Sequence, residues 1–309
     1  MNRLLLTLLL LTSLPLFAFN RSDVLISDRA QIPGSNSAFS ELWLYSSGRY
    51  AVPVGFQLID KLVPLAGGPL FVPNAGTIIF VHDGRTVAVW DGRERLFTEP
   101  GLGYTDLFTA DVELTDIAPI RSGNFLASGN GKLIEFSLQG KVREYDVPDV
   151  EHIELLADQC TLLHTGGNDD AGVHRFNLCT GEAQSDFAAL IPGEYAGAIR
   201  QLPSGDVLVA NGSAILQFDA RGSLRSSYQF PGVTHLALTA DGANFWAAGV
   251  YLDKADLRLF SPVTHESQSI QFGNDEMQTI IVPVSIRNLA VIGEWRAATI
   301  SRGRAFRRF

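Results

Sequence analysis

The chain has 309 residues, of which 46% are hydrophobic and 18% are charged, and it contains 29 glycines and 14 prolines. So many turn formers beside so few charges favour an all-β chain with a sizeable core over one built from long solvated helices. The formal net charge of −9 gives no basic field that could hold a polyanion, so we expect no nucleic-acid partner.

The first segment, residues 1–18, has the pattern of a bacterial Sec-type signal peptide. Arg3 is its positive residue, an apolar run extends from Leu4 to Phe17, and Ala18 follows as the expected cleavage point. The run is shorter than the ~20 residues that a membrane-spanning helix needs. We therefore expect a secreted or periplasmic protein with no transmembrane segment after signal cleavage, and an uncleaved anchor is the alternative.

From about residue 23 onward, a repeated unit of short alternating strands fills the chain. Its clearest copy, residues 199–230, has apolar and polar residues alternating in runs that Pro-Ser-Gly, Asn-Gly-Ser and Ala-Arg-Gly turn signals separate. Further copies lie at residues 69–99, 117–147, 153–190 and 236–272. The second strands of these copies recur at close to the roughly 40 to 50 residues of a β-propeller blade. Their centres are Val81, Ser128, Thr165, Ala210 and Ala248.

The strand count predicts a single β-propeller of six four-stranded blades, with seven blades as the alternative. DVLISDR at the amino end has the pattern of a second strand without a first, and TIIVPV near residue 280 that of a first strand without its third and fourth. The two ends of a propeller domain at residues 23–300 would then share one blade and close the ring. Residues 301–309 remain as a basic C-terminal tail.

Three stretches, residues 157–188, 200–224 and 236–249, carry a resemblance to a known family. They resemble the NHL-like repeats of secreted bacterial β-propellers, which are similar in fold to the streptogramin lyase and gluconolactonase-like propellers. The resemblance implies propeller architecture and export, and most members look like binding or recognition modules. In the lyases, histidine and glutamate of the blade strands carry the chemistry, whereas second strands here, such as FWAAG and VLVAN, offer no glutamate.

Cys160 and Cys179 are the two cysteines of the chain, and we expect them to form a disulfide. An exported chain meets an oxidising compartment, and two cysteines without CxxC spacing make neither a zinc cage nor a redox site. If the flanking strands form a hairpin that turns between Asp169 and Asp170, the two cysteines face each other directly, within bonding reach as a non-hydrogen-bonded pair.

The loops at one face of a propeller converge on the mouth of its channel, and their polar residues are the candidate site. The starts of the innermost strands offer Asp116, His152, His235 and Gln278, and the loops between second and third strands add Asp28, Arg29, His82, Asp83, Asp169, Asp170 and Glu294. Imidazole and carboxylate groups gathered there could hold a divalent metal. The candidate ligands are His152, His235 and Asp116. Alternatively, these side chains are hydrogen-bonded rim and turn residues.

The sequence contains no GxSxG elbow, HExxH motif, Walker loop or Rossmann glycine pattern. Together with the resemblance, this favours an exported, non-catalytic propeller that binds a protein, peptide or glycan and needs no cofactor. The alternative is a metal-dependent lactonase or lyase-type enzyme with its site at the channel mouth, for which a divalent metal would be the cofactor.

Overall fold

The computed structural model describes residues 23–31, 38–39, 42–45, 50–53, 70–74, 77–90, 104–166, 172–251, 254–272, 282–291, 294 and 296. Strands are the regular structure of these ranges, which contain no helix. Accordingly, no helix with the length and hydropathy to cross a membrane occurs in them. The predicted signal peptide, the tail at 301–309 and the candidates Gln278, Asp169 and Asp170 lie outside the described residues.

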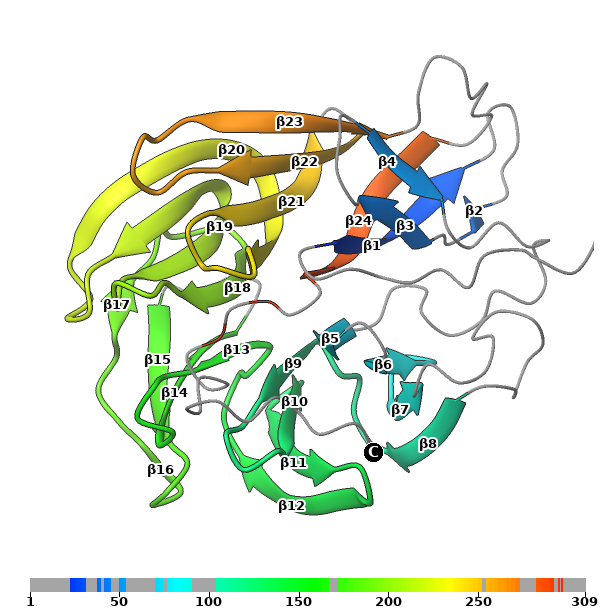
Figure 1. The fold of residues 1–309 in the computed structure, drawn as a ribbon. Coiled ribbons are helices and arrows are strands. Elements are labelled where there is room, and N and C mark those ends of the chain that lie inside the picture. Colours follow the sequence, from blue (N-terminus) through cyan, green and yellow to red (C-terminus); the bar gives the residue numbers. More distant parts are fainter. Residues whose placement is uncertain are drawn as a thin grey trace, which may run out of the picture.

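The strands form four hydrogen-bonded sheets around a common centre (Figure 1). The first sheet contains β5 (Leu70–Asn74), β6 (Thr77–His82), β7 (Thr86–Trp90) and β8 (Tyr104–Thr109). The second contains β9 (Asp116–Pro119), β10 (Phe125–Gly129), β11 (Lys132–Ser137) and β12 (Gly140–Asp146). The third contains β13 (His152–Leu155), β14 (Thr161–Thr165), β15 (Gly172–Asn177), β16 (Glu182–Ala183) and β17 (Ala188–Ala189).

The fourth sheet has 11 strands. It contains, in spatial order, β18 (Ala196–Gln201), β19 (Val207–Phe218), β20 (Leu224–Leu238), β21 (Phe245–Tyr251), β22 (Lys254–Phe260), β23 (Ser267–Phe272), β4 (Tyr50–Pro53), β3 (Leu42–Tyr45), β1 (Val24–Gln31) and β2 (Ala38–Phe39), with β24 (Val282–Val291) paired to β1. The long strand β20 pairs with β19 through residues 224–229 and with β21 through residues 235–238. The first half of β20 therefore belongs to the strand group of β19, and its second half belongs to the neighbouring strand group of β21.

The structure confirms the all-β prediction and has a propeller-like arrangement. The described residues form four sheets, not six or seven, because β20 continues from one strand group into the next and β23 pairs in parallel with β4. At the other end of the large sheet, β1 pairs antiparallel with β24, placing Val24 opposite Val291 and Gln31 opposite Val282. Strands from both ends of the chain thus meet in one sheet.

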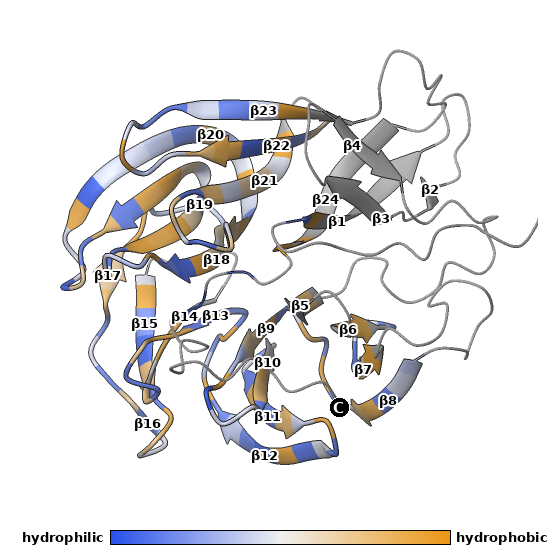
Figure 2. Cartoon of the chain, in the orientation of Figure 1, coloured by the Kyte–Doolittle hydropathy of each residue, from blue (hydrophilic) through white to orange (hydrophobic). Residues whose placement is uncertain are grey.

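The hydrophobic core lies between neighbouring sheets. Phe71 of the first sheet packs on Phe125 of the second, with ring centroids 5.8 Å apart, and Phe125 stacks on Phe136 at 5.4 Å. Strands near the centre, such as β10 and β13, are buried along their whole length, whereas the outer strand β12 is largely exposed or half-buried. Figure 2 shows the corresponding change from hydrophobic inner strands to more hydrophilic outer ones such as β12 and β23.

The predicted disulfide between Cys160 and Cys179 is confirmed, with the two Cα atoms 5.2 Å apart. The predicted register is wrong by one residue, because Thr161 lies opposite Asn177 and the amide of Leu178 donates to the carbonyl of Cys160 at 2.8 Å. Cys160 and Cys179 therefore do not face each other in the ladder. The turn that follows β15 brings Cys179 back to Cys160 at the end of the hairpin.

Candidate functional site

His152, the predicted residue at the start of β13, is buried with 5% of its surface exposed. Its Nε2 lies 2.7 Å from the hydroxyl of Tyr195, and the two rings meet edge to face at 5.9 Å between centroids. Burial lowers the pKa of His152 below its ordinary value, and the nearby carboxylate of Asp116 opposes this only in part. The imidazole is therefore neutral at pH 7 and forms a fixed hydrogen bond with Tyr195.

Asp116, at the start of β9, is the nearest acidic neighbour of His152, with its Oδ2 3.9 Å from Nδ1 of the imidazole. The carboxylate also accepts two backbone hydrogen bonds, from the amide of Ile117 at 2.8 Å and from that of Ile153 at 3.1 Å. Since Ile153 belongs to β13, Asp116 ties two innermost strands of neighbouring sheets together. The structure thus brings two of the three predicted metal ligands close to each other.

Two glutamates make the same kind of bridge further round the centre. Oε1 of Glu154 in β13 accepts the amide of Gln201 in β18 at 3.2 Å, and Oε1 of Glu294 accepts the amide of Leu238 in β20 at 2.7 Å. An innermost strand has one edge without a neighbouring strand, so its amides need other acceptors when they are buried. Carboxylates supply those acceptors at the centre of this fold.

The same two glutamates form a buried ion-pair network with two arginines. Arg296 donates to Glu154 at 2.5 Å and to Glu294 at 3.0 Å, while Nε of Arg200 in β18 donates to Glu294 at 3.1 Å. All four side chains are between 2% and 6% exposed. Burial raises the pKa of Glu154 against the opposing charges of Arg296 and Arg200. Burial alone would lower the pKa of Arg296, but Glu294 and Glu154 outweigh it and raise that pKa.

The other predicted residues within the described ranges lie in strands and turns. His235 lies in β20 opposite Ala248, and His82 ends β6. Asp83 forms the turn after β6, where its carboxylate accepts the amide of Thr86 at 2.9 Å. Asp28 and Arg29 lie in β1. Among the described residues, no group of three or more His, Cys, Asp or Glu side chains is arranged to hold a metal ion.

A second candidate site lies at the outer edge of the third sheet, where the strand beside β15 is bulged. Phe176 of β15 pairs with Ala183 of β16, and Val173 pairs with Ala188 of β17. Residues 184–187 therefore lie opposite only His174 and Arg175. Such an insertion bends the strand away from its neighbour and redirects its side chains, and bulges of this kind recur next to functional sites.

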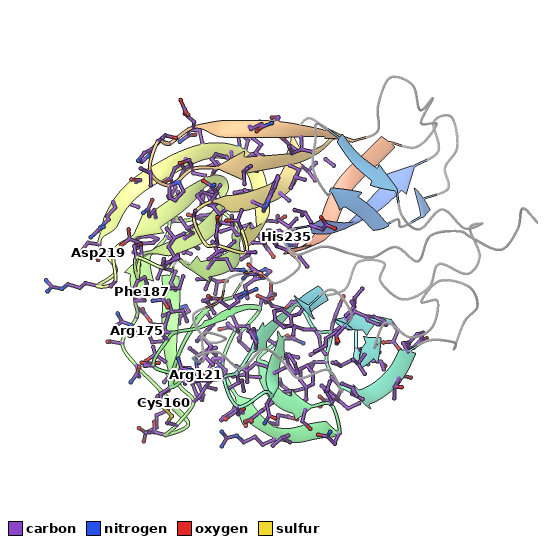
Figure 3. The ribbon with its side chains drawn as sticks, in the orientation of Figure 1. Arg121, Cys160, Arg175, Phe187, Asp219 and His235 are labelled. Carbon is purple, nitrogen blue, oxygen red and sulfur yellow. A yellow bond between two sulfur atoms is a disulfide. The ribbon has the colours of Figure 1, made fainter. Side chains whose placement is uncertain are left out.

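Phe187 anchors the bulge against the next sheet. Its ring contacts Phe218 of β19 edge to face, with centroids 6.3 Å apart, and the guanidinium carbon of Arg175 lies 5.0 Å from its centroid. Gly222, in the turn that leads into β20, packs on the backbone carbonyl of Phe187 so closely that a Cβ there would lie 1.9 Å from that oxygen. The side chains of Arg175 and Phe187 lie along this edge of the molecule (Figure 3).

Two open grooves flank Phe187. The first, here called the Arg175 groove, encloses about 370 Å³. Its walls include Thr161, Arg175, Gln184, Ser185, Phe187 and Ala220. The second, the His174 groove, encloses about 450 Å³. Its walls include Gly172, His174, Asp186, Phe187, Ala189 and Gly222. Nδ1 of His174 lies 2.8 Å from Oδ1 of Asp186 in this groove. Both volumes lie within the range of small-ligand sites, about 300 to 1,000 Å³.

The sequence patterns placed Asp116, His152 and Glu294 among the candidates but did not predict the partners that the structure gives them. Tyr195 immediately precedes the innermost strand β18, and His152 is the first residue of the innermost strand β13, so this similar position was a usable signal. Glu154 and Arg200 are charged residues in the middle of apolar innermost strands, which is a sign of buried pairing. The bulge has no sequence signal that a single chain offers, because its extra residues follow from the pairing of β16 and β17 with β15.

No protein-family model matches the chain, and no curated protein sequence matches it. Among solved structures, the chain is similar to one from a nidogen/laminin complex, with a TM-score of 0.61 and 8% identity over 87% of this chain and 98% of that one. Virginiamycin B lyase from Staphylococcus aureus has a TM-score of 0.52 and 14% identity over 70% and 74% of the two chains. Kuenenia stuttgartiensis hydrazine synthase has a TM-score of 0.52 and 10% identity over 70% and 68%. At these identities the likeness concerns the fold, and it supports a β-propeller.

Proposed function

We propose that the protein is an exported, non-catalytic β-propeller that binds a ligand, which is a protein, peptide or glycan, in the grooves beside Phe187. The main support is the bulged strand beside β15. Grooves of about 370 and 450 Å³ lie on either side of its anchored residue Phe187. At the centre of the fold, by contrast, Glu154 and Glu294 form ion pairs with their two arginines and accept hydrogen bonds from backbone amides. The outer grooves therefore have open volume for a ligand, whereas these charged side chains at the centre already bind one another.

The ring would contain six blades. The support is the pairing of strands into six groups. One group contains β18, β19 and the first half of β20, and in it the first half of β19 pairs with β18 and its second half with β20. The other five contain four strands each: β5 to β8; β9 to β12; β13, β14, β15 and the bulged strand of β16 and β17; the second half of β20 with β21 to β23; and β24 with β1, β3 and β4. In this proposal the last group closes the ring with strands from both ends of the chain. The NHL-like character of the repeats fits the same architecture.

Export is proposed from two features that agree. Residues 1–18 have the composition of a Sec-type signal peptide, and Cys160 and Cys179 form a disulfide, a bond that persists in oxidising compartments. The mature protein would be periplasmic or secreted.

A metal-dependent lactonase or lyase-type enzyme at the channel mouth is the second candidate. One observation favours it, the 3.9 Å approach of Asp116 to His152. His235 would have to complete the metal site. Against this candidate, Nε2 of His152 is engaged by Tyr195 and the imidazole is buried, so a metal would have to displace that hydrogen bond.

The binding proposal is tested by filling the grooves. Ala220 and Ala189 are exposed residues in the walls of the Arg175 and His174 grooves, so Ala220→Trp and Ala189→Trp would block a groove without disturbing the core. The matched control is Val142→Trp, at a site on β12 that is 53% exposed. The four proteins are applied to one panel of immobilised glycans and peptides. We expect wild type and control to retain the same ligand and at least one groove variant to lose it; equal retention by all four would refute the grooves as the site.

A further inference from the structure

We propose that the Arg175 groove binds a carboxylate group of a small acidic ligand through the guanidinium of Arg175. This inference rests on the proposed binding function and adds the chemical class of the ligand. It is carried by an arginine that the fold holds in place beside an open groove and leaves without an acidic partner.

The guanidinium of Arg175 is fixed by its surroundings. It lies over the ring of Phe187 at 5.0 Å, and its Nη1 points to the backbone carbonyls of Ser185 and Asp186, each at 3.4 Å. Phe187 is itself anchored by Phe218 and by the close approach of Gly222. A guanidinium held in one orientation loses little conformational entropy on binding, which favours affinity.

Arg175 differs from three other arginines that are buried or half-buried. Those three form carboxylate ion pairs: Arg200 with Glu294, Arg258 with Asp256, and Arg296 with Glu154 and Glu294. Arg175 has hydrogen bonds to carbonyl groups through Nη1, and its Nε and Nη2 have no partner within the described residues. Its charge is therefore available to a ligand in the groove.

Three acidic side chains around this edge, those of Asp158, Asp186 and Asp219, are engaged elsewhere. The carboxylate of Asp158 accepts the amides of Cys160 and Thr161 and the hydroxyl of Thr161. Asp186 pairs with His174 at 2.8 Å. Asp219 accepts two amides of its own turn, from Arg221 and Ser223. Each of these three carboxylates already has a local partner other than Arg175, so the guanidinium can take a carboxylate from a ligand.

The site favours a carboxylate over a more highly charged anion. One arginine presents a planar fork that matches the two oxygens of a carboxylate, whereas phosphate groups are usually held by several cationic groups. Gln184 lines the same groove and carries an amide that can donate to the ligand. A volume of about 370 Å³ limits the occupant to a small acid or the acidic end of a larger chain.

Isothermal titration with two pairs of probes tests this proposal. Galacturonate is compared with galactose, and N-acetylglutamate with N-acetylglutamine, on wild type, Arg175→Gln and Arg175→Lys. We expect one acid at least to bind more tightly than its neutral counterpart. Arg175→Gln should weaken the acid by about 10- to 100-fold, because a hydrogen bond to a charged group is lost. Arg175→Lys should fall between wild type and Arg175→Gln, since it keeps the charge without the fork.

The probe that responds distinguishes a sugar acid from an amino-acid carboxylate. Val142→Trp, at an exposed site on the outer strand β12, serves as the control that should leave acid binding unchanged, and thermal unfolding of each variant shows that it is folded. Equal affinity of acid and neutral probes, an unchanged affinity in Arg175→Gln, or no binding of either acid at millimolar concentration would overturn the carboxylate proposal. The groove-filling test on the glycan and peptide panel decides the binding function separately.

Discussion

Arg296 and Glu154 are 142 positions apart in the sequence, yet they form an ion pair whose side chains are 3% and 2% exposed. Arg296 follows β24 near the end of the described chain, and Glu154 lies in β13 of the third sheet. With Glu294 and Arg200, this pair links the segment after β24 to two innermost strands. Removing one member of the pair would leave the other as a buried charge without its partner.

Glu154→Gln should therefore lower the free energy of unfolding by about 3 to 5 kcal/mol, because it leaves Arg296 buried with less compensation. Chemical denaturation measures this change. Combining Glu154→Leu with Arg296→Met removes both charges and should cost less than the sum of the single substitutions. The control is Lys141→Ala, which breaks a surface pair with Glu144 and should change stability by less than about 1 kcal/mol. Equal effects at the buried and surface pairs would contradict the network.

His152 predicts a pH dependence of stability. Burial holds the pKa of His152 in the folded protein below the ordinary 6.5. As the pH falls, the imidazole is therefore protonated in the unfolded chain before it is protonated in the folded protein. Stability should then fall as the pH drops from about 7.5 to 5, by at most about 1.4 kcal/mol per pH unit from this group. In His152→Gln this contribution is absent, while the contributions of the carboxylates remain. As the pH falls across this range, the free energy of unfolding should decrease more steeply in wild type than in His152→Gln, and equal slopes would show that His152 is not buried in neutral form.

The disulfide should contribute to stability through the loop that it closes. Cys160 and Cys179 are separated by 19 residues, and a loop of this size predicts a contribution of about 3 kcal/mol. Replacing both cysteines by serine should reduce the free energy of unfolding by that amount, and reduction of wild type should have a similar effect. A serine variant as stable as the oxidised wild type would mean that the bond does not constrain the chain.

Gly222→Ala tests whether the bulge needs its close contact. Gly222 has φ +89°, and an added Cβ would collide with the carbonyl of Phe187. Gly193→Ala is the matched control, since Gly193 has φ +78° with open space around it. Both substitutions incur a cost of about 1 kcal/mol for the left-handed backbone. Only Gly222→Ala should also shift the bulge, which a larger loss of stability and altered amide chemical shifts of residues 184–187 would reveal. An equal loss of stability in both variants would show that the close contact of Gly222 with Phe187 does not hold the bulge in place.

The parts of this fold that local patterns encode were predictable. Alternating residues and turn signals around Val207–Phe218 predicted the strands, and cysteine usage predicted the disulfide. The exact register was not predictable, because one residue in an undetermined turn shifts every pair, as Thr161 and Asn177 show. The ion pairs of Arg296 and the bulge at Phe187 depend on contacts between segments distant in sequence, which one chain does not reveal.

We propose that the propeller binds its ligand without metal chemistry. Metal analysis by mass spectrometry, on mature protein purified without chelator and on a variant carrying both His152→Ala and His235→Ala, tests it most directly. The binding account predicts no tightly held divalent metal in either sample. About one equivalent of metal in wild type that disappears in the variant would contradict it and establish the channel mouth as a metal site.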